Sequence, residues 1–420
     1  MIGLVERFLL LLLLAARSAT PADETTGETR WIGSWAAAPQ PYRPGTLETF
    51  KNQTLRLIVH ASAGGRRLRI RLSNSYGDRP LFVGGAHVAR RTEGPDVEPA
   101  SDRTLTFGGR PAVTIATGAS IASDAVPLAI PPLCDLAISL YFPEETQTTT
   151  NHLLALQQGY VSPEGDSTSL AKFVAAKTIR SWPFLTGVEV DAAAGAAVAV
   201  VFGDSWVDGD GSTPDANHRW PDLLAKRLAD ANAGLLGVLN EGIIGNRLLR
   251  DSPREPPSEF GGAMGESGLA RLVRDVLDQP GVKVVVLHFG VNDLGFPGAF
   301  TPATESVTAA DLIAGFRRLI AGAHDRGIRA VGSTIGPFEA ATIAPGYYAP
   351  AKDAVRRELN AWIRDGREFD GVVDLDSVVR DPQREARLLP AFDRGDHLHP
   401  NDSGYAAIAG ATPLTLFANP

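Results

Sequence analysis

The segment AVAVVFGDSWVDGDGST, residues 197–213, places one serine and several aspartates directly after an apolar run. Three kinds of chemistry use such residues: a serine nucleophile at Ser205, a phosphatase-type aspartate nucleophile at Asp208, or a calcium-binding loop that begins at Asp208. A calcium loop of the EF-hand type needs glycine at its sixth position and glutamate at its twelfth. Those positions hold Thr213 and Arg219, so this kind of loop is excluded.

Asp208 fits the phosphatase hypothesis poorly, although that hypothesis stays open as an alternative that would need magnesium. A nucleophilic aspartate is expected directly at a strand end, whereas Asp208 lies six residues beyond Phe202, the end of the apolar run. We expect Asp208 and Asp210 to cap turns in a glycine-rich loop. For a second GDS tripeptide at 165–167, the sequence pattern predicts no strand before it and no helix after it. Ser205 is therefore the candidate nucleophile.

A general base for this serine is available near the C-terminus, in the segment DRGDHLHPNDSGY. Asp396 and His399 are three residues apart, so the carboxylate can hold one ring nitrogen and leave the other to accept the serine proton. His397 is expected to be a bystander. A metal site built from Asp396, His397 and His399 is a weaker alternative, because no remote cluster of further ligands stands out. We expect no metal and no cofactor.

Three groups could donate hydrogen bonds to the oxyanion that forms when a serine attacks an ester. They are the backbone N–H of Ser205, the backbone N–H of Gly245 in NEGIIGNR, and the side-chain amide of Asn292 in GVND. Each such donor typically contributes about 3 kcal/mol of transition-state stabilisation. The candidate site thus consists of Ser205, Asp396 and His399 as catalytic residues and Ser205, Gly245 and Asn292 as oxyanion donors.

The elements that must position these residues follow from the hydrophobic pattern. Apolar runs predict strands at 197–202, 236–242, 282–290, 328–336 and 371–376, and helical periodicity predicts helices at 219–231, 308–327 and 350–365. Repeated strand–helix units imply a parallel sheet covered by helices, and ligands bind beyond the carboxyl ends of such strands. GDSW, GNR and GVND follow the first, second and third strands, so we expect them at one edge of one sheet.

The N-terminal half has a different pattern. From Trp31 to Thr186, apolar and polar residues alternate in short segments separated by turn residues, which predicts an antiparallel β-sandwich. The alternating arginines at 67, 69 and 71 predict a solvated sheet face that could meet an acidic sugar polymer. Three tryptophans could stack on sugars, but we expect packing instead: Trp31, Trp35 and Trp182.

Length and composition indicate two domains and exclude some partners. We place a signal peptide at 1–22, the sandwich at 31–190 and the α/β domain at 195–420. The apolar run Phe8–Ala16 is too short to span a bilayer and suits the core of a signal peptide, which predicts a secreted or periplasmic protein. Cys134 is the only cysteine, so no internal disulfide can form. A net charge of −8 without a basic stripe argues against nucleic acid.

These four blocks resemble the GDSL or SGNH hydrolase family, which is named for the serine, glycine, asparagine and histidine described above: FGDSWVDG, NEGIIGNR, GVND and DHLHP. The segments GSWAAAPQ, NQTLRLIVHAS and RLSNSYGDRPL are similar to a two-domain branch with bacterial xylanase-cluster and acetyl-xylan-esterase-like members. The resemblance runs from Trp31 to the C-terminus. It implies a flavodoxin-like three-layer α/β/α domain and a metal-free serine esterase, with acetyl groups on a plant polysaccharide as the leading substrate.

The resemblance leaves alternatives within and outside the esterases: a lipase for longer acyl chains, or a non-catalytic carbohydrate-binding protein. It implies no membrane contact after signal removal and no obligate protein partner. The chain departs from the family pattern after the serine, where Trp206 and Val207 replace a small or aliphatic residue and threonine. Trp206 either packs beneath the loop or shapes the acyl pocket. We expect His288 to be a core or supporting histidine and His218 to bond locally.

Overall fold

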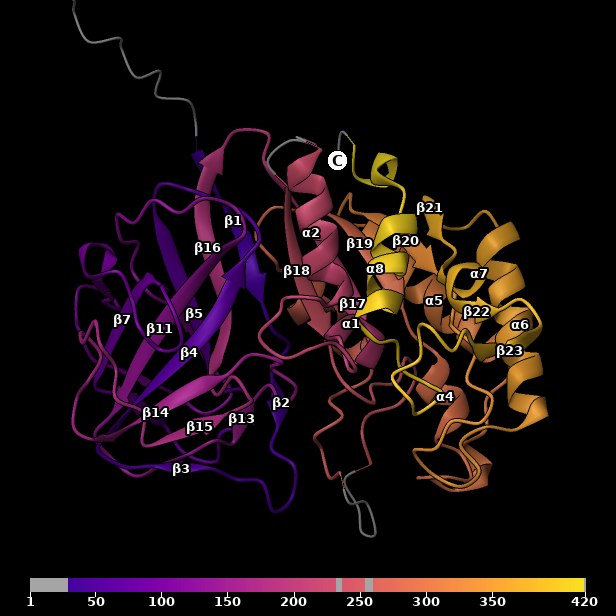
Figure 1. The fold of residues 1–420 in the computed structure, drawn as a ribbon, viewed down its shortest axis with the longest axis horizontal. Helices are drawn as coiled ribbons and strands as arrows, with labels where there is room; N and C mark the ends of the chain where they lie inside the picture. Colours follow the sequence, from indigo (N-terminus) through magenta and orange to yellow (C-terminus); the bar gives the residue numbers. More distant parts are fainter. Residues whose placement is uncertain (1–28, 232–235, 254–259, 419–420) are drawn as a thin grey trace, which may run out of the picture.

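The computed structural model describes residues 29–231, 236–253 and 260–418. The predicted signal peptide at 1–22 lies outside the described residues. Two domains stand side by side (Figure 1), the first rich in antiparallel strands and the second built on a parallel sheet.

The N-terminal domain contains two antiparallel sheets. One has the order β1-β16-β5-β10, formed by Thr29–Ala36, Leu185–Ala193, Leu68–Ser73 and Ser120–Ala122. The other has the order β15-β14-β4-β11-β7-β8, formed by Lys177–Ile179, Gly159–Glu164, Gln53–Ala61, Cys134–Phe142, Gly85–Arg90 and Arg103–Thr104. Alternate residues of both sheets form one buried cluster, among them Leu57, Ile70 and Ile138. This packing is that of a β-sandwich.

The C-terminal domain contains a five-stranded parallel sheet of order β18-β17-β19-β20-β21. Its strands are Leu236–Gly242, Ala197–Gly203, Val282–His288, Arg329–Ser333 and Gly371–Val373. The second strand of the chain lies outside the first, which is the flavodoxin-like order. Three of the five predicted strands match to within two residues. The fourth and fifth end three residues early, at Ser333 and Val373, and in the fifth this is because α7 (Leu375–Val379) begins soon after.

Both faces of this sheet are covered, which explains the uninterrupted apolar sequence of β17. Ala197, Ala199 and Val201 pack with residues of α2 (Trp220–Asp230) and α8 (Asp402–Ala411). Val198 and Val200 pack in the other cluster, which includes residues of α5 (Ala309–His324) and α6 (Pro350–Asp365). The result is three layers, with a parallel sheet between helices. The pattern predicted α2, α5 and α6 but not α8.

The two domains meet where β1 of the sandwich contacts β18, the edge strand of the parallel sheet. The Gly33 N–H donates to the Pro280 carbonyl over 2.9 Å, and the Val238 N–H donates to Ser62 Oγ over 2.9 Å. A Cβ at Gly33 would lie 2.7 Å from Leu239 Cδ1, so glycine allows the close approach without displacing that side chain. The sandwich therefore covers an edge strand that would otherwise be open to solvent.

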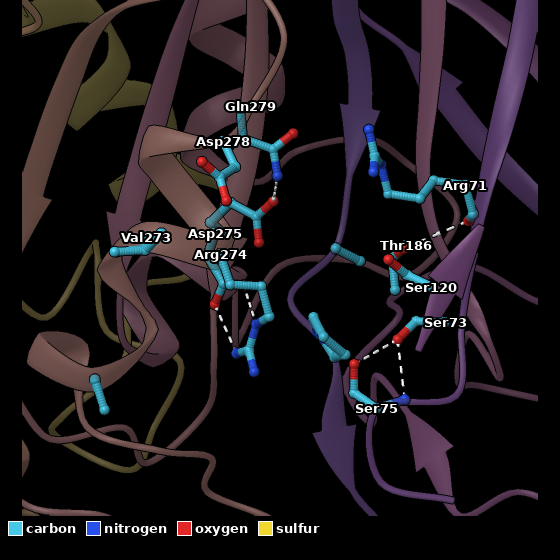
Figure 2. Close-up of a pocket in the computed structure, with 14 residues that line it drawn as sticks. Arg71, Ser73, Ser75, Ser120, Thr186, Val273, Arg274, Asp275, Asp278 and Gln279 are labelled. Carbon is cyan, nitrogen blue, oxygen red and sulfur yellow. Dashed lines mark hydrogen bonds and ion pairs between the residues drawn. The ribbon is translucent and has the colours of Figure 1, made fainter. Parts of the chain in front are cut away.

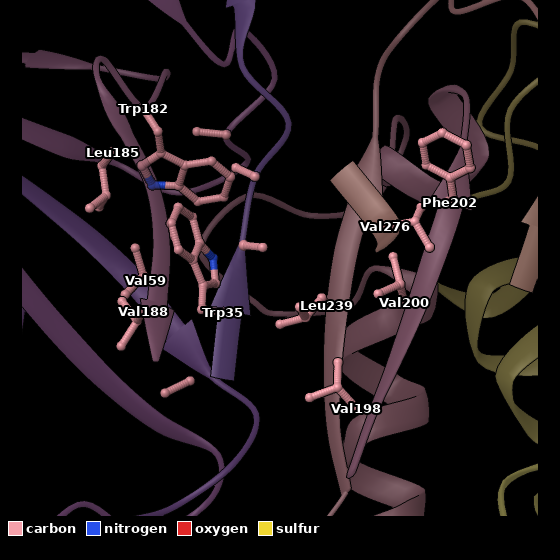
Figure 3. Packing of buried hydrophobic residues seen from close by; sticks show 14 of the residues in the cluster. Trp35, Val59, Trp182, Leu185, Val188, Val198, Val200, Phe202, Leu239 and Val276 are labelled. Carbon is pink, nitrogen blue, oxygen red and sulfur yellow. The ribbon is translucent and has the colours of Figure 1, made fainter. Parts of the chain in front are cut away.

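Apolar packing is continuous across this junction (Figure 3), from Trp35 and Trp182 on the sandwich side to Leu239 and Val198 on the other. Trp35 and Trp182 meet edge to face at 4.9 Å and are 5 % and 3 % exposed, so they pack rather than stack on sugar. At another part of the junction a polar cavity of about 290 Å³ remains, with Ser73 and Thr186 facing Arg274 (Figure 2).

The arginines at 67, 69 and 71, along and just before β5, form a partly solvated face as their alternation predicts, with side chains 51 %, 28 % and 36 % exposed, but they are also ion-paired. Two carboxylates of the neighbouring strand β16, each with a side chain 3 % exposed, pair with these arginines. Arg67 donates to Asp191 over 2.8 Å, and both Arg69 and Arg71 donate to Glu189, over 2.6 and 2.5 Å. The row is thus neutralised by acidic side chains that come from a distant part of the sequence.

Candidate active site

Ser205 lies at the carboxyl end of β17, as the first residue of α1 (Ser205–Asp208). A side chain at Gly203 would meet the His288 carbonyl oxygen at 2.4 Å, so glycine lets β17 and β19 approach here. Asp204 caps the helix by accepting the Trp206 N–H over 3.1 Å. Burial raises the pKa of Asp204 to about 8, because its charged form loses solvation and only a few contacts offset that loss. Asp204 therefore carries a proton at neutral pH.

The structure brings Ser205, His399 and Asp396 into one hydrogen-bonded series. Ser205 Oγ is 2.9 Å from His399 Nε2, and His399 Nδ1 is 2.7 Å from Asp396 Oδ2. The other carboxylate oxygen accepts the backbone N–H groups of Leu398 and His399, over 3.0 and 2.8 Å. Burial acts to raise the pKa of Asp396, but its hydrogen bonds with His399 and these two amides outweigh burial and hold the pKa well below the usual range.

The ionised Asp396 accepts only, so the hydrogen bond assigns the proton of neutral His399 to Nδ1. The lone pair of Nε2 then faces the Ser205 hydroxyl, which can donate to it. This arrangement can remove the serine proton and stabilise the resulting imidazolium.

A second carboxylate faces the same histidine, which the sequence pattern did not indicate. Asp210 Oδ2 is 3.6 Å from His399 Nε2, on the side of Ser205. Arg394 bridges the two carboxylates: its Nε is 2.8 Å from Asp396 Oδ2, and its Nη1 donates to Asp210. The prediction that Asp210 caps a turn is wrong, because its carboxylate pairs with an arginine of the C-terminal loop.

The prediction that Asp208 caps a turn is also wrong, because its carboxylate contacts residues from other segments. Its carboxylate accepts the Ile244 N–H over 2.8 Å and contacts His152 Nε2 at 3.1 Å, and its side chain is 2 % exposed. A buried carboxylate with both oxygens engaged is poorly placed to attack phosphate. The phosphatase hypothesis therefore has no support in the geometry.

The three oxyanion candidates follow β17, β18 and β19, as predicted. Asn292 Nδ2 donates to the carbonyl of Asn246, the residue after Gly245, over 3.0 Å. Tyr347 donates to Asn292 Oδ1 over 2.8 Å and so fixes which way the amide points. Gly245 has φ +73°, and a side chain there would lie 2.3 Å from Met264 Sδ. Among the hydrogen bonds of the described residues, none uses the amides of Ser205 or Gly245.

Other buried groups hold the ends of these strands together. Arg271 of α3 (Gly268–Leu272) donates to the carbonyls of Gly203 and Glu241 and to Asn246 Oδ1, over 2.7, 2.8 and 3.0 Å. No motif marks Arg271, because the three groups to which it donates at these strand ends lie 25 to 68 residues away in the sequence.

Asp293, next to Asn292 in GVND, also supports the site. It accepts the N–H groups of Leu248 and Leu249 over 2.7 and 3.0 Å. Burial raises the pKa of Asp293 to about 6, although the two amide hydrogen bonds lower it. Its place beside Asn292 was the one sequence signal that could have identified it.

The remaining histidines and Trp206 have supporting positions. Burial lowers the pKa of His288 to about 3, so it is neutral and packs 5.7 Å from the Trp206 ring. Trp206 is 1 % exposed and packs against Gly336, beneath the loop. His218 pairs with Asp402 at 2.9 Å, a contact between distant segments and not the local bond expected. His397 pairs with Asp393 at 2.5 Å, outside the Ser205–His399–Asp396 series.

Among residues 29–231, 236–253 and 260–418, no group of three or more histidine, cysteine or acidic side chains is arranged to hold a metal ion. No helix in this part of the chain is long and apolar enough to cross a membrane.

Residues 201–407 match the model of the GDSL-like Lipase/Acylhydrolase family. Three solved structures are similar to about half of the chain. One is a lipase/acylhydrolase from Enterococcus faecalis, with 18 % identity, coverage of 51 % of this chain and 92 % of that chain, and a TM-score of 0.38. Another is an aryl esterase from M. smegmatis, with 18 % identity, coverage of 51 % of this chain and 96 % of that chain, and a TM-score of 0.38. The third is a carbohydrate acetylesterase from Sinorhizobium meliloti, with 15 % identity, coverage of 51 % of this chain and 95 % of that chain, and a TM-score of 0.37. No curated protein shows significant similarity to the chain.

The matched residues span β17 to α8 and contain all four sequence blocks. This part of the chain, about half of its length, is therefore similar to the GDSL/SGNH hydrolases. The chain is accordingly a carboxylic ester hydrolase, with an SGNH hydrolase fold preceded by an antiparallel strand-rich domain.

Proposed function

We propose that this protein is an exported serine esterase that hydrolyses short-chain acyl esters, acetyl esters foremost, on plant polysaccharides. The observation that carries the proposal is the hydrogen-bonded series from Ser205 through His399 to Asp396. Such a series is the arrangement that a serine nucleophile, a general base and an orienting carboxylate require.

In the proposed reaction, His399 Nε2 takes the proton of Ser205 while Oγ bonds to the ester carbonyl carbon. The carbonyl oxygen becomes an oxyanion that accepts hydrogen bonds from the N–H groups of Ser205 and Gly245 and from the amide of Asn292. When the carbon–alkoxy bond breaks, the imidazolium gives its proton to the departing alcohol. The acyl-enzyme is then cleaved by water, which His399 deprotonates, and Ser205 regains its proton.

Asp396 stays ionised throughout this cycle, since its pKa lies well below the usual range for a carboxyl group. It therefore orients His399 and stabilises the imidazolium without taking a proton itself.

The finer parts of the proposal rest on sequence. Acetyl groups and plant polysaccharides are suggested by the resemblance to the two-domain branch with xylanase-cluster and acetyl-xylan-esterase-like members. A secreted or periplasmic location is suggested by the apolar run Phe8–Ala16 and the small residues after it. The proposal includes no cofactor and no obligate protein partner.

The test is hydrolysis of 4-nitrophenyl acetate, butyrate and decanoate, with and without EDTA, by wild type and Ser205→Ala. We expect activity that is insensitive to EDTA, highest with acetate, and lost in Ser205→Ala. Ser167→Ala is the matched control, because it alters the second GDS tripeptide, which directly follows β14 of the sandwich although the pattern predicted no strand there. Acetylated xylan is the substrate to test next.

The other outcomes separate the alternatives. Persistence of activity in Ser205→Ala would overturn the mechanism. A preference for decanoate would replace the acetyl esterase by a lipase for longer chains. A folded wild type without esterase activity would contradict the proposed function and direct attention to carbohydrate binding by the sandwich.

A further inference from the structure

A second buried histidine–carboxylate contact involves the short helix that begins at the nucleophile, and it joins the two domains. His152 follows β13 (Thr150–Asn151) of the sandwich, and its Nε2 is 3.1 Å from Oδ1 of Asp208, the last residue of α1. The side chains of His152 and Asp208 are 4 % and 2 % exposed. Burying two ionisable groups is costly unless they pair, so this contact has an energetic reason to persist.

The sandwich holds the His152 ring in one orientation. Nδ1 is 2.9 Å from the Ala38 carbonyl and Nε2 is 3.1 Å from the Asp208 carboxylate; both oxygens accept, so the geometry assigns a donating N–H to each ring nitrogen. The His152 and Trp182 backbones exchange two hydrogen bonds, of 3.1 and 2.9 Å, and their rings lie 5.6 Å apart. Trp182 itself belongs to the packed cluster at the junction (Figure 3). The ring is therefore anchored on a rigid part of the sandwich.

Asp208 connects His152 to the backbone next to Gly245, one of the proposed oxyanion donors. Its second oxygen, Oδ2, accepts the Ile244 N–H over 2.8 Å, and the next residue along the chain is Gly245. Ile243 is fixed to β17 by a bond from its N–H to the Gly203 carbonyl, over 3.1 Å. The carboxylate of Asp208 thus holds the backbone immediately before the Gly245 amide.

We propose that His152 is a positioning residue through which the sandwich sets the place of an oxyanion donor. His152 orients Asp208, Asp208 holds Ile244, and Ile244 fixes the direction of the Gly245 N–H. This inference rests on the proposed function, because it assigns the sandwich a role in the same reaction. It makes the N-terminal domain part of the catalytic unit and not only a binding module.

The test compares His152→Met, which keeps the bulk but cannot donate, with His152→Gln, whose amide can still donate to Asp208. Loss of one whole oxyanion donor costs about 10²- to 10³-fold in kcat, and a displaced donor should cost a part of that. We expect His152→Met to lower kcat about 10- to 100-fold with KM within threefold, and His152→Gln to stay within about fivefold of wild type.

A readout specific to the oxyanion is the inhibition constant of a phenylboronic acid, whose tetrahedral adduct with serine places a negative oxygen among the donors. We expect His152→Met to weaken boronic acid binding in proportion to its loss in kcat/KM, because both depend on the Gly245 amide. Tyr76→Phe is the matched control, since it removes another hydrogen-bonded contact between the domains, with Glu266 and Arg274, far along the chain from Asp208.

Full activity in a folded His152→Met, or an equal loss in Tyr76→Phe, would overturn the inference. If His152→Met does not fold, His152→Asn replaces it, because its shorter amide cannot reach Asp208. Ser205→Ala keeps the two hypotheses apart. An inactive Ser205→Ala with a fully active His152→Met refutes only the positioning role, whereas an active Ser205→Ala refutes the proposed function.

Discussion

Replacing Asp396 by asparagine should remove most of the activity and preserve the fold. The asparagine oxygen can still accept the N–H groups of Leu398 and His399, which now bind Asp396 Oδ1. The other atom becomes an amide nitrogen that donates toward His399 Nδ1, where the carboxylate accepted. The histidine must then place its own proton on Nε2, which faces Ser205, and it can no longer act as a base.

The size of the effect follows from losing the correct tautomer. In a serine protease triad the same exchange lowers kcat about 10⁴-fold, and we expect about 10³- to 10⁴-fold here, or about 4 to 5.5 kcal/mol of activation free energy. KM should change little, because the substituted group does not touch the substrate. Arg394 loses its acceptor on residue 396 but keeps Asp210, so the loop should remain in place.

The pKa of Asp396 also gives the variant a pH signature. A carboxyl group whose pKa is lower in the folded state stabilises the fold above its unfolded pKa of about 4, and that stability is lost as the pH falls through the folded pKa. The stability difference between wild type and Asp396→Asn should therefore be present at pH 7 and shrink below about pH 4. Thermal unfolding at pH 7 and pH 3 measures it.

The assay is 4-nitrophenyl acetate hydrolysis between pH 5 and 9, with Asp393→Asn as the control. Asp393 binds His397 on the same loop, so the control breaks a neighbouring histidine–carboxylate pair of the same chemistry. It should keep activity within about threefold. The idea that Asp396 sets the tautomer of His399 would be refuted if Asp396→Asn kept more than a tenth of wild-type activity. It would also be refuted if the Asp393→Asn control lost as much activity as Asp396→Asn.

Three further changes test other parts of the site. Tyr347→Phe removes the donor that orients Asn292, a bond contributing about 1 kcal/mol, so kcat should fall about fivefold in steady-state assays while KM is unchanged; no change would mean that the amide is held by Asn246 alone. Gly245→Ala should lower kcat at least tenfold, because φ at this residue is +73° and the new methyl group would meet Met264. A double variant with Met264→Ala should recover part of the loss. Equal kcat in wild type and Gly245→Ala would argue against the Gly245 amide as an oxyanion donor. Asp204→Asn tests the raised pKa of Asp204, about 8: the folded protein keeps a proton that the unfolded chain releases above about pH 4. The wild type should therefore lose up to about 4 kcal/mol of unfolding free energy between pH 5 and pH 8, and the variant should lose less. Urea unfolding at both pH values measures this, and an equal loss in the two proteins would contradict a buried neutral carboxyl group.

Sequence reasoning predicted the elements with strong periodicity and the residues placed at their ends. The apolar runs of β17 and β19 predicted strands of a parallel sheet covered by helices, and two separate clusters cover the faces of that sheet. Parallel strands end on the same side of a sheet, so Ser205, Gly245 and Asn292 could be placed together before any coordinates were known. The spacing of Asp396 and His399 was sufficient for their contact, because three residues of loop bring a carboxylate to Nδ1.

The remainder of the site depends on side chains that meet across long sequence separations. Arg394 meets Asp210 from 184 residues away, and His152 meets Asp208 from 56 residues away and another domain. Neither contact could be predicted from the spacing or the periodicity of the residues in the sequence. For the same reason the ion pairs of the β5 arginines were not predicted, since their partner Glu189 is specified only by the pairing of β5 with β16.

The contacts that the sequence predicts and the contacts between distant segments serve two different parts of the proposed reaction. Proton transfer depends on Ser205, His399 and Asp396, whose contacts are set by one strand end and one short loop. Stabilisation of the oxyanion depends on where the Gly245 amide points, and the contacts that fix this direction come from Asp208 and, through it, from His152 of the sandwich. A chain with all four sequence blocks intact could therefore retain its base and nucleophile and still lose rate, if the junction with the sandwich were altered. Proton transfer and oxyanion binding should respond to different mutations, and His152 and Asp396 are the positions where that difference is measurable.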